Sequence, residues 1–168
     1  MNRPQANEHA PYYKTYMDTV SDNVIAELEH QVNSFPSFLK GLTKDKATYA
    51  YSEGKWTIME LVGHVIDTER IMAYRALRIA RADLTPLPGF EENDYVANAH
   101  FAERNMDSLA EEFAILRKAN MYLIKSFNDD EINRIGTSNG SPMSVRALIY
   151  ILAGHVNHHR RIIEERYL

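Results

Sequence analysis

The sequence predicts an all-α protein, a four-helix bundle with a long crossover between its second and third helices. Four stretches repeat apolar residues every three or four positions, strand-like alternation is weak, and one long connection contains prolines. The chain has 168 residues, of which 45% are apolar and 25% are charged. This length corresponds to about one domain. We therefore expect a single domain over 1–168, with residues 1–20 as an N-terminal extension.

The four helices are expected at about Ser21–Lys40, Thr57–Arg81, Met106–Phe127 and Ser144–Leu168. The first is expected to use Ser21 or Asp22 as its N-cap, and Pro36 is expected to kink it or end it early. The second begins with a capping box, in which Glu60 follows Thr57 by three residues. These signals predict at which residues the first two helices begin.

The connection between the second and third helices is unusually long. Over 83–90 it contains Pro86, Pro88 and Gly89, which exclude a helix there. Connections in compact domains usually have only a few residues. A crossover of about twenty residues allows the two flanking helices to run in the same direction. It is also a candidate wall or lid for a functional site.

Composition and charge narrow the chemistry. The chain has no cysteine, which excludes disulfides, a thiolate nucleophile and Cys-ligated zinc or iron–sulfur sites. A net charge of −4 argues against nucleic-acid binding. The first residues are polar, without the apolar run of a signal peptide, and the longest apolar run, 147–153, is too short for a membrane span. We expect a cytoplasmic protein with no nucleic-acid or membrane partner.

The strongest site candidate is a histidine pair in the last helix. His155 and His159 lie about 40° apart on one helical face, the spacing at which two imidazoles can chelate a transition metal. Two buried histidines that bond to backbone or carboxylate groups would show the same spacing, so both interpretations stay open. His158 lies about 100° from His159, and the roles of His158 and of His100 are undetermined.

The second helix offers a third ligand and an unusual carboxylate. His64 lies at the edge of the apolar stripe and can still point inward, because each bundle helix faces two neighbours. Glu69 stands on the stripe itself and needs a partner if it is buried. Its candidate partners are an arginine, a backbone amide or the second ring nitrogen of a metal-bound histidine. Alternatively, Glu69 reaches the surface and pairs with Arg70 or Arg146.

Several segments together resemble the DinB/YfiT-like superfamily, and the resemblance covers about Val24–Leu168. They are Ser52–Ile58, Gly63–Arg70, the proline-rich 86–95 and the block Gly154–His159. The resemblance implies a four-helix bundle with a long crossover and a divalent metal held by three histidines, which fall on His64, His155 and His159. Imidazole ligands do not choose among zinc, nickel, iron and manganese.

The resemblance also implies a small-molecule substrate, and three functional interpretations follow. The first is a transferase that joins a low-molecular-weight thiol, as cosubstrate, to an electrophile; Arg75 and Arg146 would then hold an acidic thiol. The second is a metal-dependent hydrolase, for which Glu69 and Asp67 are the nearest candidate bases in the sequence. The third is a non-catalytic metal- or ligand-binding stress protein. The sequence assigns no catalytic or substrate-binding residue, and a homodimer is an expectation from similar proteins.

Overall fold

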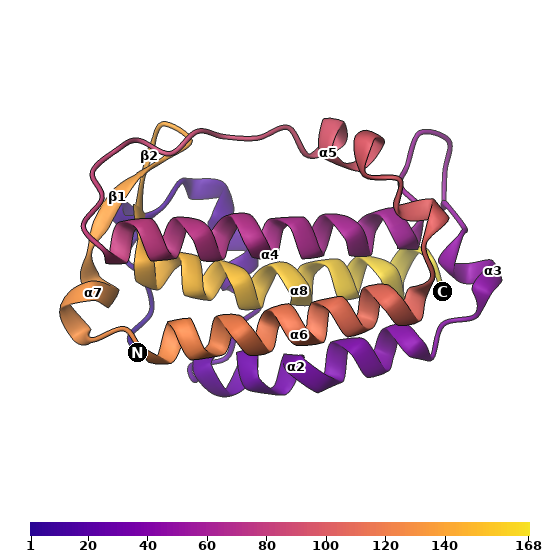
Figure 1. The fold of residues 1–168 in the computed structure, drawn as a ribbon, viewed down its shortest axis with the longest axis horizontal. Coiled ribbons are helices and arrows are strands. Elements are labelled where there is room, and N and C mark those ends of the chain that lie inside the picture. Colours follow the sequence, from indigo (N-terminus) through magenta and orange to yellow (C-terminus); the bar gives the residue numbers. More distant parts are fainter.

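Four long helices form the centre of the computed structural model, which describes residues 1–168. They are α2 (Val24–Lys40), α4 (Ile58–Ala80), α6 (Met106–Lys125) and α8 (Val145–Arg166) (Figure 1). Helices α2 and α4 each contact both α6 and α8, so the four helices form a ring. In Figure 1, α4 and α6 run in one direction and α2 and α8 in the other. This confirms the predicted bundle, including its long crossover.

Side-chain caps explain where these helices begin. The side chains of Asn23, Thr57, Asn105 and Ser144 each accept a hydrogen bond from the backbone N–H three residues later. The predicted capping box of Thr57 and Glu60 is present. The start of α2 was predicted slightly too early, because Asn23 is the residue whose side chain bonds the first turn.

The sequence led us to expect that Pro36 kinks α2 or ends it early, but the helix does not end there. Pro36 lies inside the helix, which continues to Lys40. A proline there removes one backbone N–H close to the helix end, where few further helical bonds depend on it. Pro36 itself is buried.

The connections contain short elements that the sequence analysis did not predict. They are α3 (Lys44–Ala47), α5 (Glu92–Ala99), η3 (Phe101–Glu103), α7 (Asp129–Asn133), β1 (Ile135–Ser138) and β2 (Ser141–Ser144). The two strands pair antiparallel around Asn139 and Gly140, which both have positive φ, 49° and 72°. Asn-Gly is a strong hairpin signal, so this turn could have been found from the sequence. The crossover is free of helix over 83–90, as predicted, and α5 follows that segment.

The N-terminal segment packs against the bundle. It contains η1 (Ala6–Glu8), η2 (Pro11–Tyr13) and α1 (Lys14–Met17), and α1 lies against α8. Glu8 is buried, where it accepts hydrogen bonds from Ser144 Oγ at 2.8 Å and from Arg146 NH2 at 2.5 Å. Gly154 of α8 permits the close approach of α1, because an added Cβ would lie 2.2 Å from the Tyr16 carbonyl oxygen. No helix has both the length and the apolar character needed to cross a bilayer.

A buried ion pair crosses the centre of the bundle. Arg117 of α6 is fully buried, and its Nε and NH2 each donate to one carboxylate oxygen of Glu69 at 2.8 Å. Its NH1 donates to Gln31 Oε1 at 2.5 Å, and its NH2 also donates to the Leu152 carbonyl at 3.0 Å. Asn120 donates to Glu69 at 2.9 Å. This network, the Arg117 network, joins α6 to α2, α4 and α8.

We predict that Arg117→Met lowers the free energy of unfolding by about 3–5 kcal/mol, because it leaves the Glu69 carboxylate buried without a countercharge. Urea denaturation measures the loss. The double variant Arg117→Met/Glu69→Leu should lose less than the sum of the two single changes, since it removes both charges. Lys118→Met, on the exposed side of α6, is the control and should change stability by less than about 0.5 kcal/mol. Strict additivity of the two single changes would contradict the prediction.

We predict that Gly154→Ala destabilises the fold by about 1–3 kcal/mol, because the new methyl group pushes α1 away from α8. In an unobstructed helix interior the same change stabilises by about 1 kcal/mol, so the sign of the effect is diagnostic. Thermal unfolding gives the sign, and proteolysis within residues 1–20 should become faster. A stabilised variant with unchanged proteolysis would show that α1 does not pack as described.

Candidate metal centre

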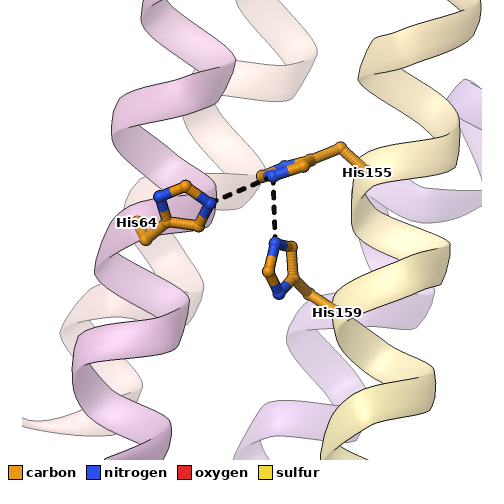
Figure 2. Close-up of side chains that lie close together, drawn as sticks. All are labelled: His64, His155 and His159. Carbon is orange, nitrogen blue, oxygen red and sulfur yellow. Dashed lines mark hydrogen bonds between the residues drawn. The ribbon is translucent and has the colours of Figure 1, made fainter. Parts of the chain in front are cut away.

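Three histidine rings converge between α4 and α8. Nε2 of His155 lies 3.1 Å from Nε2 of His64 and 3.0 Å from Nε2 of His159. Figure 2 shows His64 reaching across from α4 while the other two extend from successive turns of α8. The three candidate ligand atoms lie within 4.8 Å of one another. The structure thus brings together the three residues that the sequence nominated as metal ligands.

The helices hold these rings in place. The spacing of four residues puts His155 and His159 on one face of α8. The Arg117 network bonds α8 at Leu152, three residues before His155, and α4 at Glu69, five residues after His64. It therefore fixes the relative position of the two histidine-bearing helices within about two turns of the site.

Burial keeps the three rings uncharged. It lowers the pKa of His64 to about 4, with a smaller contribution from His158. Burial, followed by the neighbouring histidines, holds the pKa values of His155 and His159 well below the usual range. All three imidazoles are neutral at pH 7, which is the form that binds a metal.

Hydrogen bonding alone does not satisfy the three converging nitrogens. A neutral imidazole nitrogen either donates one hydrogen or accepts through one lone pair, whereas Nε2 of His155 faces two other nitrogens. A divalent cation would satisfy all three lone pairs. Ligand nitrogens about 3.3 Å apart follow from tetrahedral zinc with bonds of about 2.0–2.1 Å. The observed spacings of 3.0 and 3.1 Å are close to that value, so the donor set fits a divalent metal.

The carboxylates suggested by the sequence lie elsewhere. Glu69 accepts hydrogen bonds from Arg117 and Asn120 and from no histidine ring. Of the partners suggested by the sequence, the structure therefore shows the arginine and not a ligating histidine. Neither Arg70 nor Arg146 pairs with Glu69. Asp67 is partly exposed and pairs with Arg70 at 3.7 Å. Nδ1 of His159 is buried with no hydrogen-bond partner, although metal-bound histidines usually donate from the second nitrogen.

Two cavities flank the histidines. The first, the tyrosine-lined cavity, has a volume of about 220 Å³ and is lined by His64 and His155 together with Tyr12, Tyr13, Tyr16, Thr68, Met72, Arg75, Gly89, Phe90, Glu92, Asn139 and Ile151. The second, of about 240 Å³, contains His159 with Tyr51, Gly54, Lys55, Trp56, Leu61, Asn93, Ile162 and Tyr167. Residues of the crossover line both cavities, in keeping with the position expected for it.

The other nominated residues divide between the site and the surface. Arg75 lines the tyrosine-lined cavity, whereas Arg146 pairs with Glu8 and lies outside both cavities. His158 lies outside the histidine cluster and packs its ring on Tyr16, with centroids 4.9 Å apart. His100 is exposed, in a left-handed conformation with φ of 54°.

Two aromatic contacts to the histidines were not predicted from the sequence. The ring of Trp56 lies 4.9 Å from that of His64, and Tyr16 meets His155 edge-on at 5.5 Å. Tyr13 is buried, which raises its pKa well above the usual range. The sequence allowed Tyr12, Tyr13 and Tyr16 to pack either on the bundle or across a dimer, and the structure shows Tyr16 packed on His155 and His158 of α8.

Comparisons with known proteins agree with this structure. A family model described as the DinB superfamily matches residues 27–163. A relative from Halalkalibacterium halodurans, named "Putative metal-dependent hydrolase BH0277", is 24% identical over 147 residues, which are 80% of this chain and 81% of that protein. Among solved structures, YfiT from Bacillus subtilis, described as a probable metal-dependent hydrolase with an unusual four-helix bundle topology, has a TM-score of 0.71 at 14% identity.

The superposition on YfiT covers 97% of this chain and 90% of that one, so the two folds agree along nearly their whole lengths. The match to the family model begins within α2 and ends within α8, and it includes all three histidines. The resemblance inferred from the sequence motifs is therefore confirmed: the chain belongs to the DinB superfamily.

Proposed function

We propose that His64, His155 and His159 bind one divalent metal ion and that the protein is a metal-dependent enzyme acting on a small molecule. The observation that carries the proposal is the convergence of three neutral, buried imidazole nitrogens in one metal-sized space. An ion bound there would keep its full charge and an open position, and it would lower the pKa of a bound water or thiol.

The finer proposal is transfer of a low-molecular-weight thiol to an electrophile. One cavity is lined by His64 and His155 and a second by His159, so two organic ligands have room beside the histidines. In such a reaction a sulfur–carbon bond forms, the bond from that carbon to its leaving group breaks, and the thiol proton passes to solvent. A thiol bound to a metal loses its proton readily, so the reaction does not depend on a carboxylate base. This agrees with the engagement of Glu69 by Arg117.

A hydrolase is the second candidate. It is supported by the two relatives described above, one named a "putative" and the other a "probable" metal-dependent hydrolase. Glu92 is the carboxylate that lines a cavity together with His64 and His155, and it would be the general base of a hydrolytic reaction. A protein that binds metal without turning over any substrate would match neither candidate.

We predict that the protein, purified without a histidine tag, binds about one divalent ion per chain. His155→Ala and His159→Ala should each weaken this binding by at least about 100-fold, because each removes one of three ligands. Metal analysis after dialysis and calorimetric titration measure the change. His158→Ala is the matched control, since His158 neighbours the site but lies outside the histidine cluster. Retention of the metal by His155→Ala would refute the site.

We predict that the metal-loaded protein accelerates the reaction of a small thiol with an aromatic halide or an epoxide at least about tenfold over the metal-free protein. Loss of the thiol and appearance of the thioether are followed by mass spectrometry. Equal rates with and without metal would exclude thiol transfer. If esters or amides are instead cleaved in the absence of any thiol, and Glu92→Gln abolishes the cleavage, the hydrolase is the correct assignment.

A further inference from the structure

The tyrosine-lined cavity contains a buried arginine that has no anionic partner. Arg75 of α4 is 3% exposed, yet it forms no ion pair. Its NH2 donates to the Pro88 carbonyl at 2.7 Å, and its NH1 approaches the Met72 sulfur at 3.6 Å. A guanidinium carries five N–H donors. At least three of these donors therefore lack a protein acceptor.

The same fold shows how a purely structural arginine is accommodated. Arg117, which is also buried, meets both carboxylate oxygens of Glu69 and donates further bonds to Gln31 and Leu152. Burying a guanidinium without a countercharge is costly. The chain neutralises Arg117 with its own carboxylate, whereas Arg75 pairs with no carboxylate and lies over the Phe90 ring, 5.8 Å from its centroid, so a countercharge for Arg75 would have to come from outside the chain.

The position of Arg75 connects it with the histidines. His64, Thr68 and Arg75 extend along α4 and line one cavity, which the tyrosines of the N-terminal segment also line. The hydroxyl of Thr68 is also buried without a hydrogen-bond partner. Eleven residues separate His64 from Arg75, about 16 Å along the helix axis. A helical side chain leans toward the N-terminus, which brings the guanidinium closer to His64 than this distance.

We propose that Arg75 binds the carboxylate of a substrate that occupies the tyrosine-lined cavity. A guanidinium pairs with a carboxylate through two parallel N–H···O bonds. A carboxylate fits better than a phosphate monoester, because Arg75 supplies a single positive charge and Glu92 adds negative charge to the same cavity. The volume of about 220 Å³ limits the ligand to a small molecule. The inference rests on the proposed function, since it assigns this ligand to the reaction at the histidines.

The test compares ligands that differ only in charge. Binding of hexanoate and of neutral hexanamide to the zinc-loaded protein is measured by calorimetry in a buffer low in chloride. A second pair, 6-mercaptohexanoate and its amide, adds a thiol long enough to approach the histidines. We expect each carboxylate to bind at least about tenfold more tightly than its amide. Equal affinities within both pairs would overturn the role of Arg75.

Variants assign the preference to one residue. Arg75→Met should abolish the preference for carboxylate while the amides bind as before, and Arg75→Lys should retain part of it. Arg70→Met is the matched control: it removes the same charge from α4, but Arg70 pairs with Glu112 and lies outside the cavity, so the preference should persist. A preference that survives in Arg75→Met would overturn the proposal.

Stability provides a readout that does not depend on ligand. Replacing an uncompensated buried charge by methionine should leave the midpoint of urea unfolding unchanged or raise it. A fall as large as that of Arg117→Met would give Arg75 a structural role and overturn the proposal. If the mercapto compounds bind no more tightly than their counterparts without sulfur, thiol transfer fails, while the carboxylate preference still decides the role of Arg75.

Discussion

The ion pair between Arg117 and Glu69 is the constraint on which the arrangement of the other parts depends. A guanidinium and a carboxylate that are both buried tolerate little displacement, because each must keep its partner in a medium of low polarity. The two side chains come from α6 and α4, which lie side by side and run in the same direction. Two parallel neighbouring helices cannot be joined by a short loop. The ion pair between α4 and α6 therefore requires the long crossover that connects them.

The crossover in turn shapes the site. It returns along the whole length of the bundle (Figure 1), and on the way it contributes Phe90, Glu92 and Asn93 to the two cavities. Gly63, next to His64, permits the end of the crossover to pack closely on α4, because a Cβ added at Gly63 would lie 2.2 Å from the Phe101 ring. Arg75 bonds the crossover at Pro88. The connection that the topology requires is therefore also the wall that separates the histidines from solvent.

Local signals predicted the parts of this protein that depend on neighbours in sequence. The capping box at Thr57 and the start of the last helix at Ser144 were found in this way, and so was the spacing of His155 and His159. Contacts between segments that are distant in the sequence were not predicted. Arg117 lies among apolar positions of its helix, but no pattern within α6 indicates that its partner is Glu69. Arg146 was placed near the metal because nothing in its surroundings revealed Glu8, which lies 138 residues away in the chain.

The pairing of Glu69 with Arg117 also has a consequence for chemistry at the histidines. A carboxylate bonded to a ligating imidazole makes that ligand more basic and spreads the charge of the metal. Here the buried carboxylate is neutralised by an arginine, and the three histidines are themselves neutral. A bound divalent ion would therefore present an undiminished charge to whatever occupies its open position. Under the proposals made above, the metal and Arg75 would both favour an anionic ligand, and the Arg117 network would contribute by keeping the Glu69 carboxylate away from the metal.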